Sequence, residues 1–571
     1  MKIISQLDAC VPREALSATP AGDKWHLIAY EADGVSGIMV GAAPLVMAPD
    51  LTLALDATGW HAVYIGIWNP HHDYQGRFRV KVRLGSDPCF HDMVDPEPPL
   101  SWPGLCHLQE AFFKEADLTG EHLVIRKQNK GAPSRVNKCY VAYIRLEPLS
   151  DRQVSTIQND RADRSRRRLH ALNDGNGTFY DGPTTKEELL EQVEPYRHSD
   201  VGTVLFAVSS GDVVNYPSSI GQSWLADVGD VVPTIERVAL RDSIRTLLDK
   251  GIVPIQVLAE HCHEIGVAFH AMFRMGIIGD VPPGDIWNPH TGFVRRRPDL
   301  RMIDRDGTPL EKASYAHEEV RAAMLEMIAE VCRNYDIDGV NLCFVRGPHY
   351  VGYEDVVIED FRQEHGVDPR DLDENDERVQ RHRASYVTTL VRSARRLLDE
   401  IGAERGRRFD LTAMCYRGQA DLNLFFGLEI LTWLREGLLD TIYLSLPIDE
   451  EVLQVARDAG CSVVSHLMPS CGDARADIPE TIEMARRGFE AGSDGFWYWD
   501  VVFRQSLPAY WQLLRRIGHR DEVNSMADAP PKMSTRQLRT VAGFDMCHTT
   551  NRGSDERDYW PPAMLPIYSG G

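Results

Sequence analysis

The stretch EEVRAAMLEMIAEVCRNYDIDGVNLCFV, residues 318–345, contains the helix and strand that decide the fold. Apolar residues recur every three or four positions in its first part, which predicts an amphipathic helix. Its last part, GVNLCFV at 339–345, is a short apolar run and predicts a buried strand. A helix that leads into a buried strand is typical of the βαβ units from which parallel sheets are built.

The same alternation extends to both sides of this stretch, from residue 168 to 518. Eight strands are predicted, at 168–174, 202–210, 267–275, 339–345, 409–416, 441–446, 461–468 and 495–500. Helical segments lie between them, and several end in Gly just before the next strand, as αβ connections prefer. Eight such units in about 350 residues predict an α/β protein with a closed (β/α)8 TIM barrel rather than an open sheet.

The remaining chain is predicted to form three further parts. Residues 1–150 contain short alternating or β-branched runs split by Gly, Pro, Asn and Asp, which predict an N-terminal all-β sandwich of jelly-roll type. The polar residues 151–167 are predicted to be a linker with some helical character. Residues 519–571, rich in Pro and Met, are predicted to be a tail that packs on the protein or on a neighbouring subunit of a homo-oligomer.

Composition narrows the location and the partners. No segment has the roughly 20 apolar residues of a membrane span, so no membrane association is expected. The eleven cysteines are scattered and mostly lie in apolar runs, and no signal peptide is recognised, so we expect reduced thiols and a cytoplasmic location. A formal net charge of −22 would repel phosphate backbones, which argues against a nucleic-acid partner.

Motifs for cofactors and metals are not recognised. The sequence contains neither a GxGxxG nor a Walker pattern, so we expect no dinucleotide or ATP cofactor. It contains no HExxH or CxxC pair, so no metal is expected either.

Polar and aromatic residues at the predicted strand ends indicate a ligand site, because a (β/α)8 barrel carries its site at the C-terminal ends of the strands. Aromatic faces beside polar groups suit the apolar faces and hydroxyls of sugar rings. The predicted substrate-binding residues are Asn173, His270, Arg274, Trp287, Asn341, Cys343, Arg346, Tyr353, Tyr416, His466 and Trp499.

The run YAHEEVRAAMLEMIAEVCRNYDIDGVNLCFVRGPHYVGYE, residues 315–354, resembles the glycoside-hydrolase-like TIM barrels. Members of that group commonly contain Asp-Gly-Val/Ile-x-Leu-Asp-Phe-x-Arg at the fourth strand. Residues 361–373, 433–445 and 491–500 are similar to later parts of the same group. The resemblance covers the barrel and implies a carbohydrate substrate with a glycosidic linkage.

Cys343 departs from this pattern, because the group has an aspartate at that position of the fourth strand. Three explanations stay open. The working carboxylates lie elsewhere, or Cys343 is itself a thiolate nucleophile, or the barrel binds sugar without cleaving it. A thiolate nucleophile at Cys343 would be uncommon, because a buried strand cysteine usually acts as a small apolar residue.

Glycoside hydrolysis ordinarily uses two carboxyl groups. The candidates are Asp500, which ends the eighth strand beside Trp499, Glu354 in the loop after the fourth strand, and Asp174 in the NDGNG loop after the first. The leading hypothesis is therefore a glycoside hydrolase that acts on a small or shortened glycoside. A sugar isomerase, epimerase or lyase that uses His, Arg and a carboxylate is the enzyme alternative. A sugar-binding pseudo-hydrolase is the non-enzyme alternative.

Overall fold

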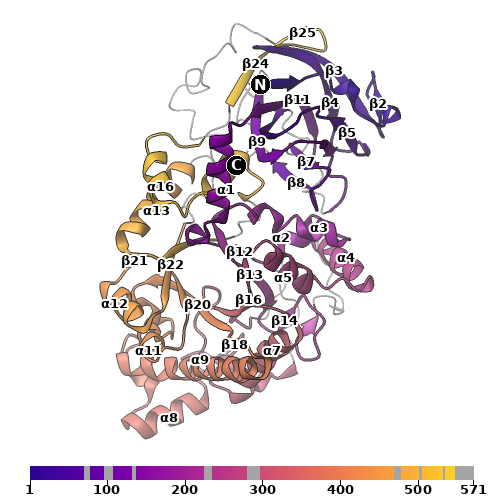
Figure 1. The fold of residues 1–571 in the computed structure, drawn as a ribbon. Coiled ribbons are helices and arrows are strands. Elements are labelled where there is room, and N and C mark those ends of the chain that lie inside the picture. The colour runs from indigo at the N-terminus through magenta and orange to yellow at the C-terminus, as the bar shows by residue number, and fades with distance from the viewer. Residues whose placement is uncertain are drawn as a thin grey trace, which may run out of the picture.

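Eight parallel strands close into a barrel in the C-terminal two thirds of the chain (Figure 1). The computed structural model describes residues 1–69, 78–94, 107–131, 137–223, 235–278, 296–467, 477–499, 504–531 and 534–546. The barrel strands are β12 (Leu169–Asn173), β13 (Val201–Ser210), β16 (Ala268–Arg274), β19 (Gly339–Cys343), β20 (Asp410–Gly418), β21 (Thr441–Ile448), β22 (Ser462–His466) and β23 (Gly495–Tyr498). The first strand, β12, pairs in parallel with both β13 and β23, which closes the ring and confirms the predicted (β/α)8 fold.

Alternation along each strand separates an inner from an outer core. In β19, Asn341 and Cys343 alternate with Val340 and Leu342. Cys343 belongs to the cluster inside the barrel, whereas Val340 and Leu342 pack with the surrounding helices. The inner cluster consists of Leu172, Leu205, Ala207, Met272, Cys343, Met414, Tyr443, Val464 and Trp497. Because successive side chains of a strand point to opposite faces, the short apolar strands supply both cores at once.

Helices cover the outside of the barrel. They are α2 (Gly177–Tyr180), α3 (Lys186–Leu190), α4 (Ile235–Asp249), α5 (Pro254–Glu264), α7 (Glu318–Asn334), α8 (Asp355–His365), α9 (Glu377–Arg405), α10 (Ala420–Phe425), α11 (Ile430–Arg435), α12 (Glu450–Ala459), α13 (Asp477–Ala491), α15 (Pro508–Leu514) and α16 (Arg520–Met526). Gly406 ends α9 and Gly460 ends α12 in the left-handed conformation, with φ of +65° and +69°. Glycine reaches this conformation without a Cβ penalty, which explains the Gly at these helix ends.

Two sheets make up the N-terminal domain, which confirms the predicted β-sandwich. The larger sheet contains β1 (Lys2–Ile4), β2 (Leu16–Ser17), β3 (Trp25–Ala32), β4 (Val35–Ala42), β6 (Trp60–Trp68), β9 (His107–Asp117) and β11 (Cys139–Pro148). The smaller contains β5 (Leu51–Ala54), β7 (Arg79–Leu84), β8 (His91–Val94) and β10 (His122–Arg126). Alternate residues of both sheets, such as Ile65 and Val82, meet in one apolar core.

The C-terminal part of the chain returns to this domain. Strand β24 (Ser534–Val541) lies between β9 and β3 and pairs antiparallel with both, and β25 (Phe544–Asp545) pairs with β24. Figure 1 shows β24 and β25, in yellow, beside the indigo strands of the N-terminus. Leu538 and Val541 of β24 complete a second apolar core with residues of β3 and β11. Part of the segment that the sequence marked as a tail is thus a strand of the first domain.

Helix α1 (Asp151–Ala162) occupies most of the predicted linker. Ser150 caps it by accepting a hydrogen bond from Gln153 N, and the Gln153 side chain accepts from Ser150 N. This reciprocal pair is a capping box, which explains why a polar stretch without buried residues is helical.

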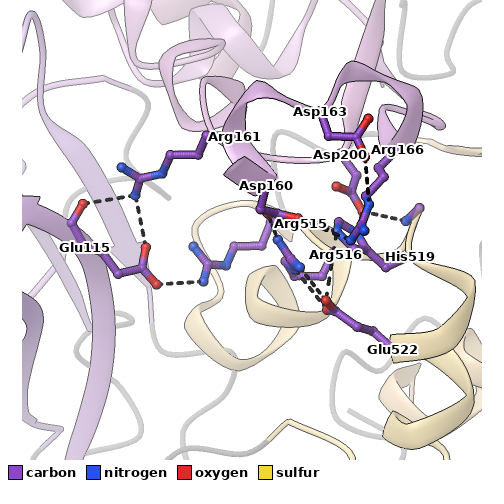
Figure 2. A network of polar contacts seen from close by, with 11 residues as sticks. Glu115, Asp160, Arg161, Asp163, Arg166, Asp200, Arg515, Arg516, His519 and Glu522 are labelled. Carbon is purple, nitrogen blue, oxygen red and sulfur yellow. Dashed lines mark hydrogen bonds and ion pairs between the residues drawn. The ribbon is translucent and has the colours of Figure 1, made fainter. Parts of the chain in front are cut away.

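Charged side chains join α1, both domains and the C-terminal helices (Figure 2). Arg161 of α1 and Arg515 lie 3.2 and 3.3 Å from opposite oxygens of Glu115 in β9. His519, whose side chain is almost fully buried, lies 2.6 Å from Asp200 Oδ2 and 2.8 Å from Asp160 Oδ1. Burial opposes protonation of His519, but the hydrogen bonds to the two carboxylates outweigh it and raise its pKa. The network therefore fastens the sandwich domain to the barrel.

Candidate functional site

The candidate site lies at the C-terminal ends of the barrel strands and in the residues that follow them, which we call the mouth. The loop after β12 carries Asp174. Its Oδ1 accepts hydrogen bonds from Asn176 N at 2.9 Å and Gly177 N at 3.1 Å. Gly175, between Asp174 and Asn176, has a φ of +80°, and a Cβ there would lie 2.4 Å from the Ala207 carbonyl oxygen. Glycine is therefore required for the turn that positions Asp174.

Asn173, predicted to bind substrate, is used within this same loop. Its amide nitrogen donates to Thr178 Oγ1 at 3.0 Å, and its oxygen accepts from Gly175 N at 2.9 Å. The loop is also held from the N-terminal domain, since Arg79 of β7 donates to Asp181 at 2.8 Å and pairs with Asp92 at 2.7 Å. Arg79 is buried, so the sandwich domain supports the loop that carries Asp174.

Arg274 is the last residue of β16, and its guanidinium lies beside Asp174. The distance from Arg274 Nη2 to Asp174 Oδ2 is 3.6 Å, which is longer than a hydrogen bond. Nε and Nη2 of Arg274 are buried and have no hydrogen-bond acceptor among the described residues. The mouth thus contains a cation that keeps unused N–H donors.

Arg346 and Trp499 complete this group. The exposed Arg346 follows β19 by three residues, and Trp499 follows β23 by one. The guanidinium carbons of Arg346 and Arg274 lie 4.9 and 5.8 Å from the centre of the Trp499 ring, within the range of cation–π attraction. We call Asp174, Arg274, Arg346 and Trp499 the mouth cluster.

Cys343 lies inside the barrel next to this cluster. It is fully buried, and its Sγ lies 4.0 Å from Met414 Sδ. Burial raises the pKa of the Cys343 thiol, although the charges of Arg274 and Arg346 act in the opposite direction. A protonated thiol is a poor nucleophile, so this environment favours an apolar packing role.

Tyr416 belongs to β20, next to β19, and His466 ends β22, two strands further around the barrel. The His466 ring stacks on Trp497, with centres 3.8 Å apart and planes inclined by 20°. Burial lowers the pKa of His466 to about 4, so the imidazole is neutral near pH 7, and its Nε2 has no partner among the described residues. The Tyr416 ring packs on Phe426 with centres 4.3 Å apart. A neutral imidazole and a phenol are suited to hydrogen-bonding sugar hydroxyls.

His270 and Asn341 point into the barrel below the mouth, which differs from the prediction that they line it. His270 precedes the end of β16 by four residues, about 13 Å along a strand. Its Nε2 lies 3.8 Å from Asp410, the first residue of β20. Asn341 is fully buried and donates to Thr412 Oγ1 at 2.8 Å. Their inward direction was predictable, but their depth follows from where each strand enters the barrel.

Glu354 and Tyr353 pack outside the barrel. Glu354 is buried, and its carboxylate accepts hydrogen bonds from Gly352 N at 3.1 Å and Ile303 N at 3.2 Å. Ile303 belongs to a hairpin of β17 (Arg301–Ile303) and β18 (Pro309–Ala313). Tyr353 lies in a separate apolar cluster with residues of α8 and α9. The structure therefore does not bring these two residues to the mouth cluster. Asp500 and Trp287 lie outside the described residues.

A pair of buried tyrosines that the sequence did not single out fixes the backbone of the mouth. Tyr315 Oη donates to the Met275 carbonyl at 2.7 Å, and Tyr350 Oη donates to the Phe344 carbonyl and lies 3.1 Å from the Arg346 carbonyl oxygen. The two tyrosines are linked by a hydrogen bond from Tyr315 N to the Tyr350 carbonyl at 2.9 Å. Gly276 also lies here, because a Cβ on it would be 2.7 Å from the Arg346 carbonyl oxygen. The sequence signal that could have pointed to this packing is Gly276, which directly follows the predicted strand 267–275.

Within the described part of the chain, no three His, Cys, Asp or Glu side chains gather in a way that could hold a metal ion. Its eight cysteines are buried free thiols. No helix there has the length and apolar character needed to cross a membrane.

A family model described as "Glycosyl hydrolase-like 10" matches residues 172–459, from β12 to α12. No curated protein matches the chain. Among solved structures, α-L-fucosidase isoenzyme 2 from Paenibacillus thiaminolyticus is similar, with 16% identity, a TM-score of 0.38, and coverage of 64% of this chain and 50% of that chain. The chain thus spans half the length of that fucosidase.

Two further structures show a similar likeness. The PgaB (BpsB) glycoside hydrolase domain from Bordetella bronchiseptica has 14% identity and a TM-score of 0.37, covering 64% of this chain and 99% of that chain. A glycoside hydrolase family 18 N-acetylglucosaminidase from Paenibacillus barengoltzii has 12% identity and a TM-score of 0.33, covering 60% of this chain and 99% of that chain. Likenesses at this distance carry no argument about substrate.

Proposed function

Because the chain belongs to the glycosyl hydrolase-like 10 family, we propose that it is an enzyme that hydrolyses glycosidic bonds at the mouth of the barrel. The observation that carries the proposal is the mouth cluster, in which the carboxylate of Asp174 faces Arg274 and Trp499 adjoins both arginines. Glycosidases combine carboxyl groups with aromatic and hydrogen-bonding residues that hold the sugar. Asn173, Tyr416 and His466 belong to the barrel strands β12, β20 and β22, and we assign Tyr416 and His466 to hydroxyl binding.

We assign Asp174 the role of general base or of nucleophile. Its Oδ1 is held by two backbone N–H groups, and its Oδ2 lies 3.6 Å from Arg274 Nη2. A second carboxyl group would protonate the leaving oxygen as the glycosidic bond breaks, while water supplies the new oxygen at the anomeric carbon. The sequence-based candidate for that acid is Asp500, which follows Trp499 directly in the chain.

Glu354 and Cys343 receive no chemical role in this proposal. Burial raises the pKa of Glu354, but its oxygens are occupied by backbone donors away from the mouth cluster. The raised pKa of Cys343 disfavours the thiolate that nucleophilic attack requires. The working carboxylates are therefore sought outside the fourth strand.

We place the substrate among small or shortened glycosides and the protein in the cytoplasm. The eight buried free thiols suit a reducing compartment, where polysaccharides arrive as fragments. Arg79 ties the sandwich domain to the loop of Asp174, which suits a domain that supports the site rather than one that captures distant polymer.

One observation favours a second function, that of a sugar-binding pseudo-hydrolase. A buried, protonated cysteine stands where related barrels commonly have a fourth-strand aspartate. If no other carboxylate pair replaces it, the mouth cluster would still bind sugar but would not cleave it.

A screen of nitrophenyl glycosides and short oligosaccharides with the purified protein separates the two functions. We expect release of nitrophenol or of reducing sugar from at least one of these glycosides, and loss of that release in both Asp174→Asn and Asp500→Asn. Binding of a glycoside in calorimetry without release from any member would support the pseudo-hydrolase instead.

A further inference from the structure

Among the described residues, neither arginine of the mouth cluster has a carboxylate oxygen within hydrogen-bond distance. Arg79 and Arg145, which are largely buried like Arg274, each lie 2.7 Å from a carboxylate oxygen. Arg346 forms no ion pair with any described residue, and the nearest carboxylate oxygen to Arg274 is 3.6 Å away. The described residues therefore compensate this pair of cations only in part, in a protein with a formal net charge of −22.

The arginines are held in place without being neutralised. The Trp499 ring lies under both guanidinium groups, at 4.9 and 5.8 Å, and cation–π attraction leaves their N–H donors available. Tyr350 Oη bonds the Arg346 carbonyl at 3.1 Å, and Gly211 N donates to the Arg274 carbonyl at 3.1 Å. Arg274 ends β16 and pairs in register with Cys343 at the end of the adjacent strand β19, and Arg346 follows Cys343 by three residues. They are therefore preorganised side by side.

The burial of the Arg274 charge costs desolvation free energy, and an anion bound to the guanidinium would offset that cost. The Arg274 side chain is only 14% exposed, and its buried Nε and Nη2 have no acceptor among the described residues. Asp174 offsets part of the Arg274 charge from 3.6 Å, and its Oδ1 is bonded to the backbone. Guanidinium groups bind carboxylate and sulfate oxygens through paired N–H donors.

We propose that the glycoside bound at the mouth carries a negative charge, as the carboxylate of a uronic acid or as a sulfate ester, and that Arg274 and Arg346 bind it. This inference rests on the proposed function for the identity of the site, and it names the class of substrate. Asp174 lies beside the anion site, so the charged group of the sugar would be held next to the reacting bond.

The test compares matched pairs of sugars on the full chain. Calorimetry measures binding of methyl glucuronide against methyl glucoside, methyl galacturonide against methyl galactoside, and glucose 6-sulfate against glucose. The variants are Arg346→Gln and Arg274→Gln, with Arg396→Gln, an exposed arginine of the outer helix α9, as the control. Nitrophenyl glycosides of the same pairs report cleavage in parallel.

We expect at least one acidic sugar to bind about tenfold or more tightly than its neutral partner, with a preference that weakens as salt rises. Arg346→Gln and Arg274→Gln should remove that preference, while Arg396→Gln retains it. The uronate and sulfate arms identify which anion the site takes. Equal binding of each pair, a preference that survives both mouth variants, or no binding of any acidic sugar at millimolar concentration would overturn the inference.

The same experiment separates this inference from the proposed function. Cleavage of neutral glycosides with no effect of the arginine variants would leave the hydrolase proposal standing and remove the anion site. Arginine-dependent binding of acidic sugars without cleavage of any would keep the anion site and remove the hydrolase.

Discussion

Arg274 Nη2 and Asp174 Oδ2 lie 3.6 Å apart at the mouth of the barrel, near enough for strong attraction but too far for a hydrogen bond. The pair joins the end of β16 to the loop after β12, across the intervening strand β13. An internal ion pair with a purely structural role would be expected to close to about 2.8 Å, as those of Arg79 do. This geometry leaves Nε and Nη2 of Arg274 without an acceptor among the described residues.

Asp174→Asn should lower kcat/KM by about 10² to 10⁴, because it removes the charge that acts on the reacting sugar. The fold should persist, because the Asn oxygen can still accept hydrogen bonds from Asn176 N and Gly177 N. Steady-state kinetics and a melting curve measure the two effects. Glu490→Gln, an exposed change on the outer helix α13, is the control and should leave both unchanged. Near wild-type kinetics of Asp174→Asn would remove Asp174 from the mechanism.

Gly276→Ala should disturb the mouth without touching a charged residue. The added Cβ would lie 2.7 Å from the Arg346 carbonyl oxygen, so the loop that carries Arg346 must shift. We expect a loss of about 1–3 kcal/mol in the free energy of unfolding and weaker substrate binding, seen as a raised KM. Gly22→Ala, where a Cβ would meet no atom within 4 Å, is the matched control. An unchanged KM would mean that the Arg346 loop does not contribute to binding.

Cys343→Ser should retain most activity, because the buried thiol has a raised pKa and packs against Met414. Placing a hydroxyl there should lower the free energy of unfolding by about 1 kcal/mol. Kinetics of the variant, together with intact-mass analysis after turnover, measure both roles of the cysteine. Loss of activity combined with a covalent sugar adduct on Cys343 in the native protein would establish a thiolate nucleophile.

The barrel could be predicted from the sequence because its signal is local. Each strand is a short apolar run and each helix repeats apolar residues at helical spacing, so the eight units can be counted without knowing any contact. The resemblance to glycoside-hydrolase-like barrels rests on the segment around the fourth strand. Both the predicted barrel and the predicted resemblance are confirmed. Residues at strand ends, such as Arg274 and Trp499, could be placed near one another because parallel strands end on the same side of a barrel.

Positions that depend on long-range packing could not be predicted. The inward direction of His270 follows from alternation, yet its depth depends on where β16 begins relative to its neighbours. The direction of Glu354 is determined by the hairpin that supplies Ile303, which lies 51 residues earlier in the chain. Strand β24 pairs with β3, which lies about 500 residues earlier in the sequence, and no local sequence pattern predicts that pairing.

His519 should make the junction between the two domains sensitive to pH. Its pKa is raised above 6.5 in the folded protein, so its stabilising contribution is fully present below about pH 6.5 and is lost as the pH rises through the folded value. His519→Gln should therefore lower the free energy of unfolding by about 1–3 kcal/mol near pH 6, and by less near pH 9. Melting curves across this range measure the difference, with the exposed His122→Gln as the control. A difference that grows with rising pH would contradict the assignment.

Mass spectrometry of the reaction products of the native protein tests the central claim, that the mouth cluster hydrolyses glycosides, most directly. Hydrolysis adds the mass of one water across the two fragments, a lyase adds none, and an isomerase leaves the substrate mass unchanged. The proposal predicts fragments that together contain one added water, formed by the native protein and by Glu490→Gln but not by Asp174→Asn. Products without the added water, or fragments formed equally by Asp174→Asn, would contradict it.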